Sequence, residues 1–576
     1  MARVGGGVKG KRGARIAEAA EKDGGITPVG RVLGSVDATP LELFVGVDEG
    51  KHVQLDDLVV IETAGPEGLV RFYGVVDVVR KRYEGASFDG DAFRAAEGLL
   101  PVEVSYAAHV QITRIDPEVF VPPHPGDRVS VVRGEALAQA LSFDRMEKKL
   151  AIGLSRSGEA LFANLEFVDG TRGAHASISG ISGVATKTSY ATFLLYSLFN
   201  GAALGADAIN SKALVFNVKG EDLLWLDRPN ARLDEEARRG YERLGLPAGP
   251  FKSVGIYAPA RRGAPKSTPM PDTGGRQEGV RPYVWTMRAF ARDRLLRFAF
   301  AEAEDARAQV SFVIARVERV LEQASEVGDP KDPGIVVEDT RIESFSDLVD
   351  LLDSDALDRM VRSAASGTLD AFRRRLHAAA MHMGHLVRGD ASATGLEIDW
   401  SRRQVTVVDI HRLHSLAQMF VVGVVLKRAL EEKERLGRSK PLLFVVLDEL
   451  NKYAPRDGWS PIREVLLDIA ERGRSLGVSL VGAQQTASEV ARRVVANASL
   501  RIVGRLDSAE AERGEYGWLG RTAKLRAAFL QPGTMIVAQP EIPTPLLLRF
   551  PFPGWATRAS EAVEPPEDDP FARVRR

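Results

Sequence analysis

Short, fully apolar runs set the strongest limit on what this chain can fold into. Each run is bounded by polar turn residues and lacks the alternation of apolar and polar positions that marks a half-exposed strand. The runs are Leu214–Val218, Val405–Ile410, Leu442–Leu447, Val478–Ala483, Leu500–Val503 and Thr534–Ala538. Strands of this kind are buried on both faces, as in a parallel sheet covered by helices. Helical stretches lie between the runs, so we expect an α/β core.

One of those helical stretches has clear start and stop signals. Ser460-Pro461 supplies an N-cap residue followed by proline at the first helical position, and Gly477 follows the last apolar position. We therefore expect a helix from Ser460 to about Gly477.

Composition limits the class of protein further. The chain has 576 residues, 44% of them hydrophobic, which is enough for two to four domains with their own cores. Its formal net charge is -1, so contact with nucleic acid must come from local basic surface. It has no cysteine, which excludes disulfides and thiol catalysis and suits a cytoplasmic location. No apolar run approaches the roughly 20 residues needed to cross a bilayer, so we expect no membrane association.

Changes in residue composition along the chain predict six regions. Short β-branched segments separated by Gly, Asp and Pro indicate a small β-barrel, and the prolines of Pro122–Gly126 indicate a linker after it. A stretch rich in Ala, Arg, Leu and Asp indicates a helical insertion in the core. The predicted regions are a flexible basic tail (1–27), the N-terminal β-barrel (28–125), a first part of the core (126–287), the helical insertion (288–395), a second part of the core (396–552) and a disordered tail (553–576).

A glycine-rich segment before an apolar helix is the first candidate site. Phosphate chains need glycines so that backbone N–H groups can approach, a lysine for charge, and a hydroxyl for magnesium. The candidate nucleotide-binding residues are Gly180, Gly183, Thr186, Lys187, Thr188 and Ser189. Gly180 lies seven residues before Lys187 instead of six, and Thr186 replaces the usual glycine. The alternative is a Gly/Ser turn beside a chance Lys-Thr pair.

A pair of acids closes the apolar run Leu442–Leu447. Ligands of open α/β sheets bind outside the carboxyl ends of the strands, where Asp448 and Glu449 would lie. We expect Asp448 to hold a metal together with Thr188, and Glu449 to activate a water. The alternative is a solvated turn, and the P-loop-like segment earlier in the chain argues against that alternative.

Two later strands supply further candidates. Gln485 follows the run Val478–Ala483 and would sense the terminal phosphate. Arg501 and Arg505, on the next predicted strand, would point the same way and reach the phosphate of a neighbouring subunit. The alternatives are a polar loop and ordinary surface arginines.

The order of these motifs resembles the HerA branch of the FtsK–HerA P-loop translocases. The likeness lies in the barrel, the P-loop, Leu447-Asp448-Glu449-Leu450-Asn451-Lys452, Ala483-Gln484-Gln485 and Leu500-Arg501-Ile502-Val503-Gly504-Arg505. It implies a HAS-like N-terminal barrel and a RecA-like core with a parallel sheet. It also implies a homo-hexamer around double-stranded DNA that uses ATP and Mg²⁺.

The same resemblance implies a function. A HerA-type ATPase is a DNA-stimulated ATP hydrolase and DNA translocase or helicase that acts with a NurA-type nuclease in DNA end resection and double-strand break repair. Two alternatives remain: a similar ring serving a phage-defence effector, and a scaffold that binds nucleotide with weak turnover. Thr186 before Lys187 keeps the second open, because a β-branched side chain stands where backbone usually bends close to phosphate.

Overall fold

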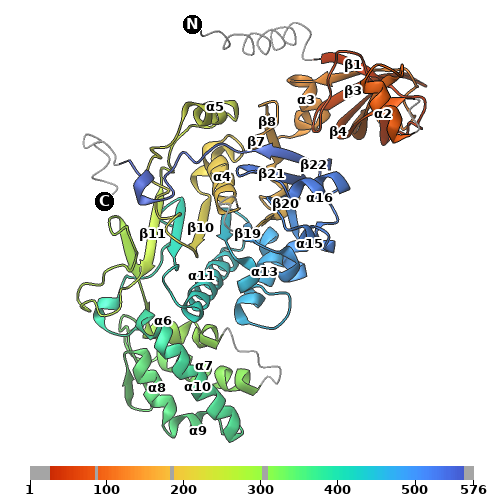
Figure 1. The fold of residues 1–576 in the computed structure, drawn as a ribbon. Helices are drawn as coiled ribbons and strands as arrows, with labels where there is room; N and C mark the ends of the chain where they lie inside the picture. The colour runs from red at the N-terminus through yellow and green to blue at the C-terminus, as the bar shows by residue number, and fades with distance from the viewer. Residues whose placement is uncertain (1–25, 85–87, 182–186, 301–308, 363, 564–576) are drawn as a thin grey trace. The chain divides into compact units, whose positions relative to one another are not determined.

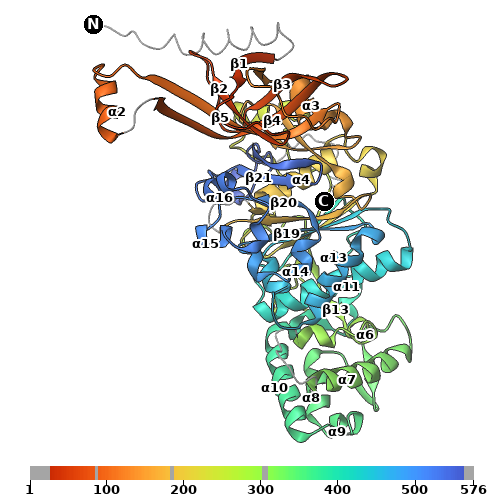
Figure 2. The same cartoon turned by 90° about the vertical axis from the view of Figure 1, so that its right-hand side faces the viewer.

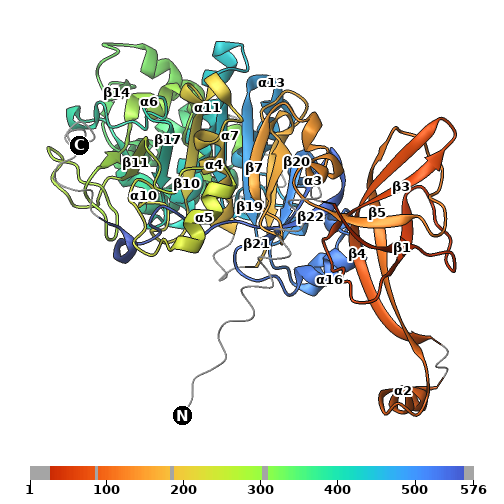
Figure 3. The same cartoon turned by 90° about the horizontal axis from the view of Figure 1, so that it is seen from above.

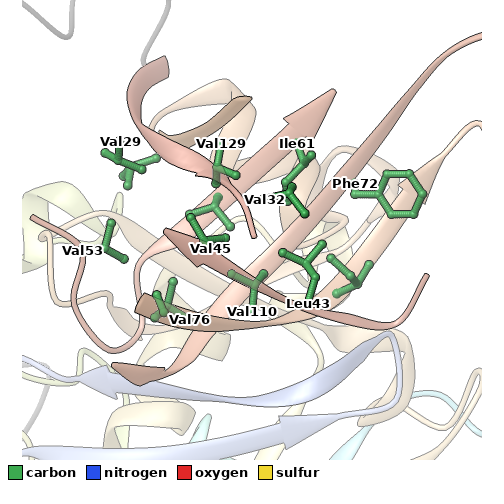
Figure 4. Close-up of a cluster of buried hydrophobic side chains, with 14 of the residues drawn as sticks. Val29, Val32, Leu43, Val45, Val53, Ile61, Phe72, Val76, Val110 and Val129 are labelled. Carbon is green, nitrogen blue, oxygen red and sulfur yellow. The ribbon is translucent and has the colours of Figure 1, made fainter. Parts of the chain in front are cut away.

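The first unit of the chain is built around a closed antiparallel barrel. A computed structural model describes residues 26–84, 88–181, 187–300, 309–362 and 364–563, which divide into two units (Figure 1). The barrel strands, in the order β1-β2-β5-β4-β3-β6, are β1 (Ile26–Val32), β2 (Glu42–Val47), β3 (Leu58–Gly65), β4 (Gly68–Glu84), β5 (Glu103–Asp116) and β6 (Arg128–Val132). Alternate side chains such as Ile61, Phe72 and Val110 fill its interior (Figure 4).

The predicted small barrel is therefore present, but its predicted end at residue 125 is wrong. β6 follows the Pro122–Gly126 segment and pairs with both β1 and β3, so it closes the barrel. The proline segment is a loop inside the domain, tied back by Gly126 N–H to the Val32 carbonyl at 2.9 Å. Prolines stop a strand, but they do not end a domain when the next strand returns to the same sheet.

β4 and β5 continue beyond the barrel as a two-stranded arm. The helix α2 (Asp89–Ala96) lies at its far end (Figures 2 and 3). The same unit contains α3 (Glu135–Ala140), α16 (Arg521–Ala527) and the antiparallel strands β7 (Lys149–Leu154), β8 (Ala160–Asn164), β21 (Thr534–Gln539) and β22 (Ile542–Arg549). The run Thr534–Ala538 was expected in the parallel core. It forms β21 instead, which pairs antiparallel with β22.

The second unit contains a parallel sheet, as the apolar runs predict. Its strands, in the order β12-β11-β17-β10-β18-β19-β9-β20, are β12 (Val280–Tyr283), β11 (Val254–Pro259), β17 (Val405–Asp409), β10 (Lys212–Asn217), β18 (Leu443–Leu447), β19 (Val478–Gln484), β9 (Ala174–Ser179) and β20 (Ala498–Val503). Every neighbouring pair is parallel. The five central strands from β17 to β9 are buried along almost their whole length, as strands covered on both faces must be.

Helices cover this sheet. The main ones are α4 (Lys187–Asn200), α11 (Ser415–Leu436) and α13 (Pro461–Leu476), while α5 (Glu235–Arg243) packs on α4, where the Tyr241 and Tyr196 ring centroids lie 5.8 Å apart. The predicted start and stop of α13 are confirmed: the Ser460 hydroxyl accepts a hydrogen bond from Arg463 N–H at 3.2 Å, and Gly477 ends the helix with φ +68°. Short helices α12 (Leu450–Tyr453), α14 (Arg492–Ala496) and α15 (Ser508–Ala511) lie in the loops between strands.

A mostly helical segment is inserted between β12 and β17. It comprises α6 (Met287–Arg292), α7 (Gln309–Glu326), α8 (Phe345–Asp353), α9 (Ala356–Met360) and α10 (Ser366–Met383), with the hairpin β14 (Ile335–Val337) and β15 (Thr340–Ile342) and the short parallel pair β13 (Trp285–Thr286) and β16 (Val387–Arg388). The helices gather at one end of the second unit (Figure 1). None of the helices within the described ranges is long and apolar enough to cross a membrane.

The predicted disordered tail 553–576 is wrong for its first part. Trp555 is buried against Tyr196 and Phe251, with ring centroids 5.1 Å from each. Glu561 is also buried, and its carboxylate accepts hydrogen bonds from the Arg232 guanidinium and the Thr557 hydroxyl at 2.9 and 2.8 Å. An aromatic anchor and a satisfied carboxylate hold this segment on the second unit. Residues 564–576, and residues 1–25 of the predicted basic tail, lie outside the described residues.

Candidate active site

Polar residues gather at the carboxyl edge of the parallel sheet. The register brings the strand ends level: Leu447 of β18 lies beside Gly482 of β19, and Ser179 of β9 lies beside Gln484 of β19. β19 is thus the single strand between the end of β9 and the acids that follow β18. The segments after these strands meet at the edge where open α/β sheets bind ligands.

Lys187 is the first residue of α4 and is 8% exposed. Its Nζ donates a hydrogen bond to the Gly180 carbonyl at 2.7 Å. Burial lowers the pKa of Lys187, and the positive charge of Lys219 adds to this, while Asp448 and Glu449 oppose it. A buried ammonium at a helix N-terminus, behind a glycine turn, is the arrangement that receives phosphate.

The turn after β9 is held close to the neighbouring strand ends. Gly180 N–H donates to the Gln484 carbonyl at 3.2 Å, and Ile181 N–H donates to the Arg505 carbonyl at 2.8 Å. A Cβ atom on Gly180 would lie 3.3 Å from the same Arg505 oxygen, so a side chain there would crowd the turn. The predicted residues Gly183 and Thr186 lie outside the described residues, and Ser189 is half-buried in the first turn of α4.

Thr188 and Asp448 are brought together although they are far apart in the sequence. The Thr188 hydroxyl donates to Asp448 Oδ2 at 2.8 Å. A hydroxyl and a carboxylate are oxygen donors of the kind magnesium prefers, and magnesium sites commonly use one or two protein ligands with phosphate and water completing the shell. The pair therefore fits a magnesium ion bound with a nucleotide.

Glu449 has an unusual backbone. It is a non-glycine residue in the left-handed region, with φ +56° and ψ +42°, and its own N–H donates to Asp448 Oδ1 at 2.8 Å. The next residue, Leu450, starts α12 and packs directly on Gly482 of β19, where a Cβ would come within 2.5 Å of the Leu450 side chain. The lack of a side chain at Gly482 lets the acid turn sit tightly against the sheet.

Lys219 is a further member of the site. Its Nζ lies 2.5 Å from Glu449 Oε1. Lys219 follows the end of β10 at Asn217, and a lysine in a turn of this kind is usually solvated. Its pairing with Glu449 follows from the parallel register of β10 and β18, which periodicity along one strand does not reveal.

The two glutamines after β19 differ in their surroundings. Gln484 is fully buried, and its Nε2 donates to the hydroxyls of Ser177 and Ser179 on β9 at 2.7 and 2.9 Å. Gln485, the predicted sensor, is exposed at the strand end. Gln484 is the last residue of β19, which is buried along its whole length, and it ties β19 to the strand that leads into the glycine turn. Gln485 lies beyond the end of the strand, where it is accessible to a ligand.

The predicted arginines lie on β20 and just after it. Arg501 is half-buried on β20 and donates to the carbonyls of Ala496 and Ala498 at 3.4 Å. β20 ends at Val503, so Arg505 lies beyond the strand and is exposed. The expectation that both arginines share one strand face therefore applies only to Arg501.

A buried polar chain next to the site was not foreseen from the sequence. Asn217, at the end of β10, donates to Asp409 Oδ1 at 2.8 Å and to the Gly220 carbonyl at 2.9 Å. His411 also hydrogen-bonds Asp409 at 2.7 Å, which raises the pKa of that imidazole. The sequence signal for this chain is that a polar residue ends each of the two apolar runs. Asn217 ends β10 and Asp409 ends β17, and the two residues lie side by side in the parallel register.

We compared the sequence and the fold of this chain with those of known proteins. No protein-family model and no curated protein matches the sequence. VirB4 of Thermoanaerobacter pseudethanolicus is 14% identical, with a TM-score of 0.46 over 70% of this chain and 96% of that one. The bacterial conjugative coupling protein TrwB is 13% identical in an unbound form, with a TM-score of 0.45 over 74% of this chain and 94% of that one. TrwB with ADP and Mg²⁺ gives 14% and 0.46, over 74% and 95%. Similarity at this level assigns no function to the chain.

Proposed function

We propose that the chain is a magnesium-dependent ATP hydrolase whose site lies between the start of α4 and the acids after β18. Lys187, Thr188 and Ser189 at the start of α4, with Gly180, Gly183 and Thr186 before it, would bind the phosphates. Thr188 and Asp448 would hold magnesium, which supplies charge neutralisation at the phosphates when bound. Glu449 would orient the attacking water, and Gln485 would contact the terminal phosphate.

One contact carries this proposal. The hydrogen bond between Thr188 and Asp448 joins the two segments that the sequence predicts to share one magnesium–triphosphate. A chance Lys-Thr pair and a solvated Asp-Glu turn have no reason to meet at the carboxyl edge of one sheet. The buried Lys187 ammonium beside them supports the same reading, because a buried lysine is costly unless an anion repays its desolvation.

We further propose that hydrolysis drives movement along double-stranded DNA. Support comes from the order of the barrel, the P-loop, the acids, the glutamines and the arginines, which resembles HerA-type translocases. In this proposal the chain forms a homo-hexamer, Arg501 or Arg505 acts on the neighbouring subunit's nucleotide, and a NurA-type nuclease cuts the DNA during double-strand break repair.

A second candidate function is a ring scaffold for a phage-defence effector, with weak ATP turnover. The ion pair between Lys219 and Glu449 favours it, because Lys219 engages Oε1 of the carboxylate that would otherwise orient the water. Thr186 in place of the usual glycine favours it as well.

Steady-state ATP hydrolysis, with and without duplex DNA, separates the two candidates. We expect turnover that duplex DNA stimulates, and a loss of about a thousandfold in Glu449→Gln, within the range for removing a general base. Glu464→Gln is the matched control, because Glu464 is about half exposed on α13 and lies outside the site. Turnover that is slow, indifferent to DNA and unchanged in Glu449→Gln would support the scaffold instead.

A further inference from the structure

The loop after β10 places Lys219 against the acid turn in a fixed way. β10 pairs in parallel with β18, with Phe216 opposite Leu447, so the residues that follow each strand emerge side by side. Gly220 has φ +58°, and its carbonyl accepts a hydrogen bond from the buried Asn217 side chain at 2.9 Å. This turn holds the backbone of Lys219 in place, while the side chain reaches Glu449.

The two charged groups differ in their access to solvent. The side chain of Lys219 is 52% exposed and that of Glu449 is 23% exposed, with 2.5 Å between Nζ and Oε1. An ammonium group has three donors, so Lys219 can meet a second anion from the solvent side. The contact with Lys219 takes up part of the hydrogen-bonding capacity of Glu449 Oε1 and constrains the direction of the carboxylate.

The charges at the site balance in the absence of nucleotide. Lys187 and Lys219 are positive, and Asp448 and Glu449 are negative. Lys219 and Glu449 are in direct contact, and Asp448, Lys219 and Glu449 all lie within electrostatic reach of Lys187. A triphosphate bound at Lys187 adds negative charge beside Lys219, and the balance of attraction on Lys219 then moves from Glu449 toward the phosphate.

We propose that Lys219 exchanges partners, from the Glu449 carboxylate to the terminal phosphate of a bound nucleoside triphosphate, and so frees Glu449 to orient the attacking water. This inference rests on the proposed hydrolase function. A diphosphate lacks the terminal phosphate and leaves the ion pair in place. Lys219 is thus a positioning residue that restricts an active Glu449 to the triphosphate-bound state.

The test compares binding of ADP and of a non-hydrolysable ATP analogue, each with magnesium, to the full chain. We expect Lys219→Met to weaken the analogue about tenfold and ADP less than twofold, because one charge-assisted hydrogen bond to phosphate is lost. Lys219→Arg should recover most of that loss. Glu449→Gln should tighten the analogue in the wild-type background and clearly less in the Lys219→Met background, because the released lysine provides the gain.

Several outcomes would overturn the exchange. Equal losses for ADP and the analogue, or additive effects of the two substitutions, would mean that Lys219 does not change partner. A change in affinity for duplex DNA alone would assign the lysine to a nucleic-acid phosphate instead. Lys440→Met is the matched control: its 2.6 Å ion pair with Asp207 lies before β10 and β18, away from the site, and its loss should leave both affinities unchanged. The hydrolase proposal is tested separately by turnover: it stands if the wild type hydrolyses ATP and Lys187→Ala does not, whatever Lys219→Met does to the two affinities.

Discussion

The two ends of the parallel sheet in the second unit differ in how far their charged side chains are exposed to solvent. Before the strands, Lys440 and Asp207 form an ion pair that is largely exposed, and such pairs contribute little to stability. After the strands, Lys187 is buried and Asp448 and Glu449 are half-buried around it. Charges withdrawn from water in this way cost free energy that a hydrophobic side chain would not. The difference indicates that the carboxyl edge is kept for a charged ligand.

The amino end of the sheet has its own buried titratable group, and there the group is kept neutral. His175 on β9 is 3% exposed, with φ +67°, and its Nδ1 accepts a hydrogen bond from Leu480 N–H at 2.9 Å. Burial lowers its pKa to about 4. Burial therefore keeps the imidazole of His175 neutral near pH 7.

The largest expected effect is the pH dependence that His175 gives to the free energy of unfolding. The unfolded chain takes up a proton at His175 near pH 6.5, whereas the folded chain resists it down to about pH 4. The contribution of His175 to the free energy of unfolding is therefore fully present above pH 6.5. As the pH falls toward 4, about 3 kcal/mol of that free energy is lost. Chemical denaturation of wild type and His175→Asn at pH 7.5, 6 and 5 measures it.

Asparagine is the suitable replacement, because it tolerates positive φ and its side-chain oxygen can accept the Leu480 hydrogen bond. The carboxylates that titrate in the same range are shared by both proteins, so the difference between them isolates His175. We expect that difference to shrink as pH falls. Two curves that stay parallel from pH 7.5 to 5 would show that His175 is not held neutral by the fold.

A smaller effect is expected when the metal-binding pair is weakened at the carboxyl end. Asp448→Asn keeps the shape but removes the negative charge: its one oxygen can accept from Glu449 N–H, and its amide nitrogen can donate to the Thr188 hydroxyl. We expect the magnesium concentration for half-maximal ATP turnover to rise between tenfold and a hundredfold, the usual cost of weakening a metal site. An unchanged magnesium requirement would mean that Asp448 serves only to hold the acid turn.

Most of the fold followed from the sequence because burial on both faces leaves a simple pattern. The runs that became β10, β17, β18, β19 and β20 were identified correctly, and the start of α13 could be read from Ser460. Thr534–Ala538 shows the limit: an apolar run marks a buried strand, but it does not distinguish a parallel neighbour from the antiparallel β22. β6 was missed for a related reason, since pairing across the barrel is not visible along the chain.

The site was predictable as a set of strand ends, but its contacts were not. The order of motifs brought Lys187, Thr188 and Asp448 together correctly. The ion pair of Lys219 and the burial of Gln484 depend on which strands are neighbours, and neither is encoded in local spacing. Trp555 was missed because its aromatic partners Phe251 and Tyr196 lie 304 and 359 residues away in the sequence, while the acidic and proline-rich residues after it resemble a disordered tail.

The most direct test of the central claim is a calorimetric titration of the chain with a non-hydrolysable ATP analogue, with and without magnesium. Wild type should bind the analogue more tightly with magnesium present, and Lys187→Ala should lose at least tenfold in affinity because its buried ammonium meets the phosphates. Two results would contradict this claim: the wild type does not bind the analogue, or Lys187→Ala binds it as tightly as the wild type. In either case the start of α4 and the acids after β18 do not together bind a magnesium–triphosphate.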